Sequence, residues 1–260
     1  MFKSLLPTRI LPSERRVVEV GWLLFANQWS MIFDTPRPLF RKDAPPQHAK
    51  SASFCPAIID HESRIFEVTC PYDLQLGCRL DGERFVVWDL SKDMSAVQSD
   101  DLKRVLKISG RKVWRHPDRP ILQLTAPYMF VADEPVYITQ MPAFGFYRDP
   151  PYPGTVVPGR FPVHIWTRAL IWAFEWYDIK KPLILRRGEP WFYVRFETFD
   201  PSRPVRLVEA EMTPELREYA NAINGVTHFV RRTFSLFDTA RSRRPRKLLV
   251  KRDSNSPANL

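Results

Sequence analysis

The stretch LIWAFEWYDIKKPLILRRGEPWFYVRFE, residues 170–197, decides the fold that this sequence predicts. It contains three apolar runs of strand length, separated by Asp, Lys, Pro and Gly, which are typical of turns. In the first run, every second residue is large and apolar, so these residues are expected to share one buried face while Glu175 points away. They are Leu170, Trp172, Phe174 and Trp176.

The second and third runs of this stretch are expected to form a β-hairpin. Gly188 and Glu189 stand between them, and Gly in the first central position suits a two-residue turn. Pro190 lacks a backbone N–H, which places that end of the hairpin at a sheet edge. The pairing would set Leu183 and Leu185 opposite residues of the third run. Their partners would be Val194 and Phe192.

Alternation along the third run predicts two faces with different roles. Phe192, Val194 and Phe196 belong to the core face, and Glu197 to the other. Aromatic rings beside Arg and Glu on a sheet can bind a sugar, a base or a peptide. An alternative is that they are half-buried cross-strand pairs under a loop, in which Glu175 or Glu197 neutralises Arg195. The predicted ligand-binding face comprises Glu175, Arg186, Trp191, Tyr193 and Arg195.

The rest of the chain favours a mainly β fold, an antiparallel sandwich or jelly roll with a C-terminal helix and a basic tail. Short apolar runs recur from about residue 55 onward, bounded by Pro, Gly and Asp, without the alternation of strands and helices that a parallel sheet requires. The expected parts are an N-terminal segment with an irregular connector, a β-rich core, the helix and the tail. Their ranges are 1–54, 55–210, 211–240 and 241–260.

The C-terminal helix is expected to begin at Thr213, a favourable N-cap residue, followed by Pro214 at the first helical position. Apolar residues then recur at helical spacing and form one stripe, which needs the sheet or another subunit to cover it. Gly225 weakens the helix and is expected to bend or split it. A shorter helix is expected near residues 98–106. The stripe comprises Leu216, Tyr219, Ile223, Val226, Val230 and Phe237.

The cysteines and the apolar runs indicate a cytoplasmic protein without a membrane partner. Cys55, Cys70 and Cys78 are an odd set without a CxxC motif, so we expect reduced thiols. The N-terminus lacks the apolar stretch of a signal peptide. The run 17–33 contains Glu19, Asn27 and Gln28 and is too short and too polar to span a bilayer.

The net charge of +10 is concentrated at the C-terminal end of the chain. Seven basic residues and no acidic residue occur in 241–252, so the remainder carries about +3 (10 minus 7). Such a run indicates an extended arm that binds nucleic acid, an acidic protein surface or a neighbouring subunit, or else a solvated tail. Leu248, Leu249 and Val250 could add an edge strand. The predicted polyanion-binding residues are Arg241, Arg243, Arg244, Arg246, Lys247, Lys251 and Arg252.

One short motif raises a metal hypothesis. His116 and Asp118 have the HxD spacing of two ligands of a facial iron(II) site, and His164 is the downstream candidate for the third. An oxygenase of this kind would use Fe(II) and 2-oxoglutarate. The sequence around the motif, RHPDRP, has Pro at 117 and 120, which favours a turn.

Other catalytic motifs do not occur in the sequence. We find no zinc-binding HxxxH, HxH or HExxH, no P-loop and no GxSxG. Cys70 or Cys78 could meet His61 as a nucleophile, but nothing in the sequence selects that pairing. The sequence therefore favours a protein that is not an enzyme and needs no cofactor.

Four segments resemble a family of uncharacterised proteins encoded by tailed phages and some bacteria. They are FCPAIIDHESRIFEVTCPYDL, TAPYMFVADEPVYITQMPAF, PGTVVPGRFPVHIWTRALIWAFEWYD and LILRRGEPWFYVRFE, and the resemblance covers roughly residues 50–250. The family has no assigned activity, so the resemblance implies a phage context but no mechanism. We therefore expect a structural or interaction protein of a phage particle or its assembly, in the cytoplasm or the virion, with a protein partner or a second copy of itself. The two alternatives are the iron oxygenase and a nucleic-acid-binding accessory protein.

Overall fold

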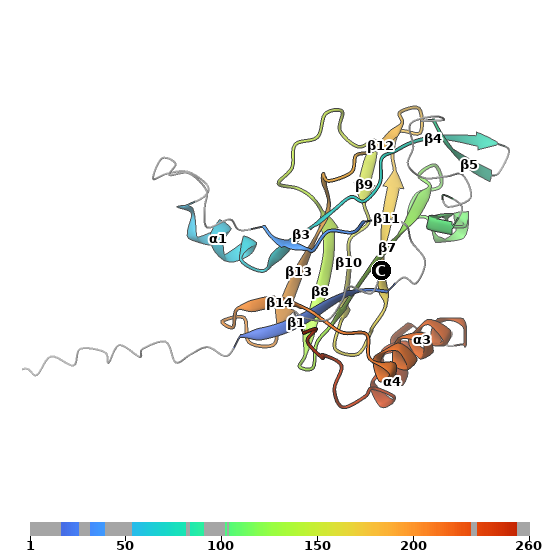
Figure 1. The fold of residues 1–260 in the computed structure, drawn as a ribbon. Coiled ribbons are helices and arrows are strands. Elements are labelled where there is room, and N and C mark those ends of the chain that lie inside the picture. The colour runs from blue at the N-terminus through green and yellow to red at the C-terminus, as the bar shows by residue number, and fades with distance from the viewer. Residues whose placement is uncertain are drawn as a thin grey trace, which may run out of the picture.

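Two large β-sheets packed face to face form the body of the protein, which confirms the predicted mainly β sandwich (Figure 1). The two C-terminal helices lie at one end of the sandwich, and a hairpin of a small third sheet lies at the other end. The computed structural model describes residues 17–25, 32–39, 54–81, 84–90, 102, 104–229 and 233–253.

The three sheets are almost entirely antiparallel. Among the described strands, only β1 and β14 pair in parallel. The six-stranded sheet, in the order β14-β1-β7-β11-β9 with β6 beside β7, contains β1 Val18–Leu24, β6 Leu106–Ile108, β7 Ile121–Val131, β9 Gly154–Val156, β11 Ala169–Trp176 and β14 Val205–Glu209. The five-stranded sheet, β10-β8-β13-β3-β2, contains β2 Arg37–Pro38, β3 Ile65–Thr69, β8 Val136–Pro142, β10 Gly159–Pro162 and β13 Pro190–Thr198. The third sheet, β12-β4-β5, contains β4 Leu74–Asp81, β5 Arg84–Asp89 and β12 Leu183–Leu185.

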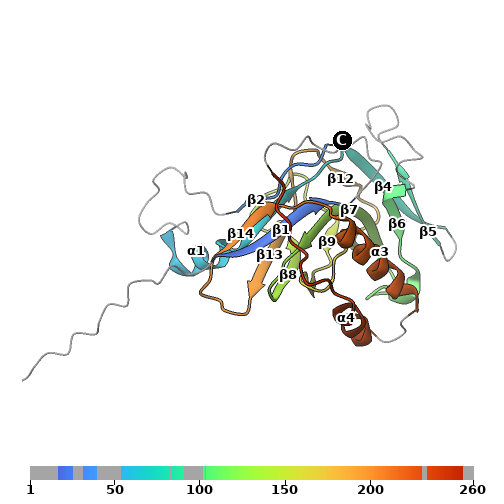
Figure 2. The same ribbon diagram turned by 60° about the horizontal axis from the view of Figure 1, so that its bottom comes forward.

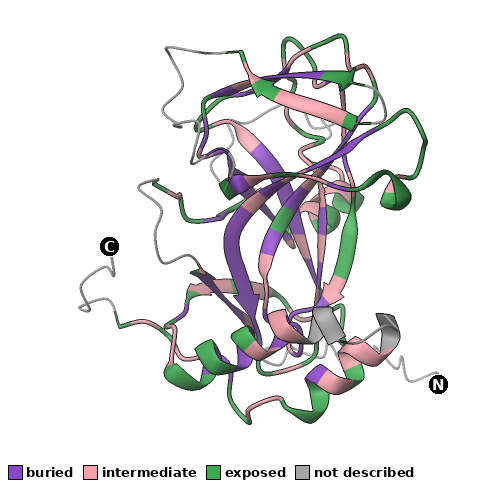
Figure 3. Ribbon diagram, turned by 90° about the vertical axis from the view of Figure 1, so that its right-hand side faces the viewer, coloured by how far each residue is buried: buried purple, intermediate pink, exposed green. Residues whose placement is uncertain are grey.

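Alternate residues of the facing strands build the core between the two large sheets. Buried residues, purple in Figure 3, are concentrated in the strands of the sandwich. The predicted apolar face of β11 is confirmed, because its four large side chains are all buried in this core. Trp172 and Phe174 stack with ring centroids 5.1 Å apart. From the facing sheet, Phe196 packs edge-on against Phe66 and Phe130. Each fully buried side chain of this size contributes roughly 1.5–3 kcal/mol through loss of contact with water.

The predicted hairpin of residues 183–197 is wrong. β12 pairs with β4, where Leu183 lies opposite Leu76, whereas β13 lies in the middle of the five-stranded sheet between β3 and β8. A turn does occur, but Gly188 is its second central residue, with φ +81° and a hydrogen bond from Glu189 N–H to the Arg186 carbonyl at 3.3 Å. Because β3 and β8 occupy both edges of β13, β12 has no edge left to pair with.

The helices are α1 Pro56–Glu62, α3 Pro214–Phe229 and α4 Thr233–Ser242, together with a 3-10 turn at Arg111–Val113. The predicted N-cap is confirmed, since Leu216 N–H donates to Thr213 Oγ1 at 3.2 Å. The helix expected for 211–240 is divided into α3 and α4, but not at Gly225, which lies inside α3. Most of the helix predicted for 98–106 lies outside the described residues. Of the described helices, none has the length and apolar character required to cross a membrane.

The apolar stripe of α3 packs on the outer face of the six-stranded sheet in the same chain (Figure 2). Leu216, Tyr219 and Ile223 are buried there beside Met129 and Val131 of β7. The Tyr219 hydroxyl oxygen lies 2.8 Å from the carbonyl oxygens of Ile165 and Ala240, so it links α3 to α4 and to the turn between β10 and β11. The side chains of Val226 and Val230 lie outside the described part.

Replacing Leu216 with Ala should lower the free energy of unfolding by about 2–4 kcal/mol, because the change leaves a cavity between α3 and the sheet. Glu218→Ala, at an exposed position of the same helix, should change it by no more than about 0.5 kcal/mol. Urea titration followed by tryptophan fluorescence measures both values. Equal destabilisation by the two variants would contradict the packing of the stripe on the sheet.

Candidate functional site

The structure does not bring the five residues of the predicted binding face onto one open surface. Trp191 is fully buried, with its ring 5.6 Å from that of Trp172 and 5.5 Å from that of Tyr72. A bulge between Pro190 and Phe192 interrupts the alternation, so both Trp191 and Phe192 face the core. Tyr193 does face outward, but the ring of Phe144 covers it at 5.2 Å.

The charged members of the predicted face are engaged in different places. Glu175 lies on the six-stranded sheet and forms an ion pair with Arg115. Arg186 donates to the Asp149 carbonyl at 3.1 Å and lies 3.5 Å from a Glu189 carboxylate oxygen. Arg195 is half-buried, and neither predicted glutamate neutralises it, because Glu197 pairs with Arg160 instead. These side chains therefore act in separate local contacts.

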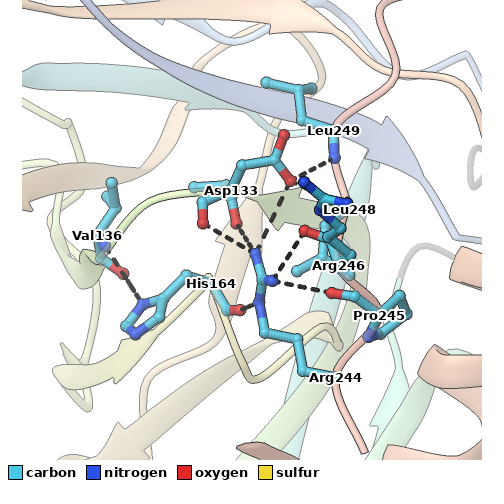
Figure 4. Close-up of polar contacts among 9 residues, drawn as sticks. Asp133, Val136, His164, Arg244, Pro245, Arg246, Leu248 and Leu249 are labelled. Carbon is cyan, nitrogen blue, oxygen red and sulfur yellow. Dashed lines mark hydrogen bonds and ion pairs between the residues drawn. The ribbon is translucent and has the colours of Figure 1, made fainter.

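The three proposed iron ligands do not converge. His116 and Asp118 are exposed and form a local turn, in which Asp118 N–H donates to His116 Nδ1 at 3.2 Å. His164 Nδ1 lies 3.1 Å from the Val136 carbonyl oxygen (Figure 4). Burial is the main cause that lowers the pKa of His164, and the positive charges of Arg244 and Arg241 add to the effect. Across the described residues, which include all three, no group of three or more His, Cys, Asp or Glu side chains could hold a metal ion.

The C-terminal basic segment is not an extended arm as far as residue 253. After α4 it runs back across β1 and β14 (Figure 2). The side chains of Leu248 and Leu249, which belong to this segment, are buried. The Asp133 carboxylate accepts hydrogen bonds from both of their N–H groups, at 2.6 and 3.1 Å. Glu211 N–H donates to the Val250 carbonyl, so the predicted edge pairing occurs only as a short bridge beside β14.

Arg244 is the centre of this docking contact (Figure 4). Its side chain is only 17% exposed, and it donates to the carbonyl oxygens of His164 at 2.5 Å, Asp133 at 2.9 Å and Ala132 at 3.3 Å. It also lies 3.8 Å from the Asp133 carboxylate. Because carbonyls of two separate loops meet on one guanidinium, Arg244 joins the C-terminal segment to the sandwich.

Three further basic residues of the predicted polyanion set are paired with acids. Arg241 pairs with Asp238, Lys251 with Glu19 and Arg252 with Glu209. Hydrogen bonds from Lys251 first, and then from Arg206, lower the pKa of Glu19. Within the described part of the chain, only three side chains of the set are exposed without an acidic partner. They are Arg243, Arg246 and Lys247.

The candidate functional site is a pocket of about 320 Å³ at the loop that joins β8 to β9. The loop, yellow-green in Figure 1, extends beyond the ends of these strands. The exposed ring of Tyr147 lies at its rim, 87% accessible to solvent, and the buried ring of Trp191 lies within its wall. The lining residues are Pro142, Ala143, Phe146, Tyr147, Arg148, Pro151, Tyr152, Gly154, Thr155, Val156 and Trp191.

Arg148 holds the pocket loop against the sandwich. It forms an ion pair with Glu189, donates to the Pro190 carbonyl at 2.6 Å and is only 9% exposed. Its guanidinium lies over the rings of Tyr152 at 4.0 Å and Phe146 at 5.1 Å. Burial raises the pKa of Tyr152, so its hydroxyl is neutral at physiological pH. The only charge among the described lining residues is thus already neutralised.

The edge strand β9 forms another side of the pocket. Val157 N–H donates to the Ala173 carbonyl, and Tyr177 N–H donates to the Pro153 carbonyl. The hydrogen-bonded pairs of an antiparallel ladder alternate, so the backbone groups of Gly154 and Val156 point away from β11. A Cβ atom at Gly154 would lie 2.0 Å from the Glu175 carbonyl oxygen, so a side chain at this position would push β9 off the sheet. Behind the pocket, Tyr152 Oη and Trp191 Nε1 are buried and find no hydrogen-bond partner among the described residues.

This site was missed by reasoning from the sequence alone. Its loop, PAFGFYRDPPYPG, has four aromatic and four proline residues around one Arg. This density of aromatic and proline residues is the feature of the sequence that could have indicated a binding loop. No family model, curated protein or solved structure matches the chain, so the geometry alone identifies the candidate.

The cysteines are free, and two of them are buried. Burial raises the pKa of Cys70 to about 12 and that of Cys78 to about 11. At a pH of about 9, above the ordinary thiol pKa of about 8.5, both therefore stay protonated in the folded protein. Iodoacetamide should alkylate the half-buried Cys55 first and the other two only after unfolding in urea, as peptide mapping by mass spectrometry can determine. Rapid alkylation of Cys70 or Cys78 in the folded chain would contradict this.

Replacing Arg244 with Ala should lower the free energy of unfolding by about 2–3 kcal/mol, because several half-buried carbonyl oxygens lose a charged donor. Arg243→Ala removes the same side chain from an exposed neighbouring position and should have an effect of at most about 0.5 kcal/mol. Urea titration gives the two values. A fully solvated tail would instead make the two variants indistinguishable.

Proposed function

We propose that this protein is a non-enzymatic interaction protein that binds a partner through the pocket at the β8–β9 loop. The observation that carries the proposal is the combination of an exposed aromatic rim, Tyr147, with a rigidly held aromatic wall. Tyr and Trp side chains provide large contact areas and dominate the energy of many interfaces. The pocket volume of about 320 Å³ is near the lower end of the range for ligand sites, roughly 300–1,000 Å³.

The chemistry of the surrounding groups supports binding rather than catalysis. The charge of Arg148 is used to hold the loop, so it is not free to act on a substrate. The thiols of Cys70 and Cys78 are protonated at neutral pH because burial raises their pKa values. Neither group has the activation that a nucleophile or an acid–base catalyst requires.

The partner that we propose belongs to a phage particle or to its assembly. Support for this context comes from the resemblance of residues 50–250 to a family encoded by tailed phages. The closely packed sandwich and the C-terminal segment docked on it suit a structural component, because two hydrophobic clusters hold the sheets, the helices and this segment together.

Selection from a random linear peptide library on the immobilised full-length protein tests the binding role of the pocket. Peptides that it enriches should bind Tyr147→Ala about tenfold more weakly than the wild type, as expected for an aromatic hot spot. Phe199→Ala is the matched control, because Phe199 is 94% exposed and does not line the pocket. If no enriched peptide distinguishes Tyr147→Ala from Phe199→Ala, the pocket is not the docking site and the proposal fails.

A further inference from the structure

We infer that the pocket at the β8–β9 loop accepts an uncharged, proline-rich peptide segment in the extended polyproline II conformation. This inference rests on the proposed function and adds the chemical class of the ligand. It depends on three properties of the pocket: its charge, the character of its walls and its hydrogen-bonding groups.

The pocket has no free charge to offer to a ligand. Arg148 is the one charged residue among its described lining residues, and its two terminal nitrogens are used by Glu189 and the Pro190 carbonyl. A charged ligand would lose its hydration on entering and would find no counter-ion. The pocket therefore selects for uncharged groups.

The walls of the pocket are rings. Phe146, Tyr147 and Tyr152 provide aromatic faces, the buried ring of Trp191 lies behind them, and prolines 142 and 151 add rigid apolar edges. Aromatic-lined grooves are the surfaces on which polyproline II segments dock, because prolyl rings pack against aromatic faces. A proline-rich segment is already extended before it binds, so it loses little conformational entropy.

The backbone of the pocket offers donors. Gly154 and Val156 of the edge strand β9 direct their N–H groups away from β11, and the described strands include no second neighbour for β9. Trp191 Nε1 and Tyr152 Oη also have no partner among the described residues, but both atoms are buried behind the pocket and do not face a ligand in it. The donors that the pocket presents are therefore the edge N–H groups of Gly154 and Val156, and a ligand carbonyl that meets one of them gains a hydrogen bond.

A polyproline II segment supplies the complementary groups. Its carbonyl oxygens make no internal hydrogen bonds and are free to accept from these donors. Its prolines have no N–H group, so the segment brings no donors of its own that would need acceptors in the pocket. An ordinary extended strand would bring such donors.

The test uses fluorescein-labelled decaproline and the full-length protein, with fluorescence polarisation as the readout. We expect saturable binding that unlabelled decaproline reverses, that Tyr147→Ala weakens about tenfold and that Phe199→Ala leaves unchanged. In a second measurement, decaproline should shift the indole N–H resonance of Trp191, which the Trp191→Phe variant identifies. A glycine–serine peptide of equal length is the control ligand.

The inference is overturned if decaproline does not bind saturably or if the glycine–serine peptide binds equally well. If library peptides without proline, or a chitin oligosaccharide, bind in a manner that depends on Tyr147 while decaproline does not, the ligand class is wrong but the pocket remains a binding site. If no ligand distinguishes Tyr147→Ala from Phe199→Ala, the proposed function fails as well.

Discussion

The contact between Trp172 of β11 and Trp191 of β13 is the interaction on which the rest of the structure depends. The two rings lie 5.6 Å apart and connect the two large sheets through the centre of the core. Trp191 reaches this position because the bulge after Pro190 turns its side chain inward. The ring of Tyr152 then packs against Trp172, which fixes the end of the β8–β9 loop. The candidate site is thus a direct consequence of how the sheets are joined.

Arginine side chains bind separate segments to this sandwich. Arg148 holds the pocket loop, Arg244 holds the C-terminal segment and Arg115 reaches the buried carboxylate of Glu175. A guanidinium suits this task because its several donors can satisfy carbonyl oxygens and a carboxylate at the same time. Net charge is therefore a poor guide to function here. Much of the basic excess of the C-terminal segment is used inside the molecule and is not free for an acidic partner.

Local periodicity predicted the elements well but not their partners. The alternation of β11 and the N-cap at Thr213 were both predicted correctly, since each depends only on neighbours in the sequence. The prediction that β12 pairs with β13 was wrong because β12 pairs with β4, which lies roughly a hundred residues earlier in the chain. The prediction of the face on which Trp191 lies was wrong because a bulge shifts the register by one position. No residue type in the sequence indicates this bulge.

The candidate site escaped prediction for a related reason. The residues that line it come from the β8–β9 loop, from β9 and from Trp191, which the predicted hairpin would have placed on an outer surface. The tail was predicted to be an extended arm because charged residues dominate its composition. The burial of Leu248 and Leu249 holds it against the sandwich instead. Apolar pairs of this kind have no periodicity, so their burial depends on the gap that α3 and the sheet leave for them.

The size and charge of the pocket also limit how tightly it can bind. A space of about 320 Å³ seats only one or two rings of an extended segment, and no ion pair adds to the contact. A single site of this kind therefore gives modest affinity, since the ordering of the ligand offsets much of the gain from burial. In an assembly that contains many copies of the protein, the first contact raises the effective concentration of the partner at the other copies. Many weak contacts together then give stable attachment. Weak, uncharged docking would therefore suit the particle component that we propose better than a protein that acts alone.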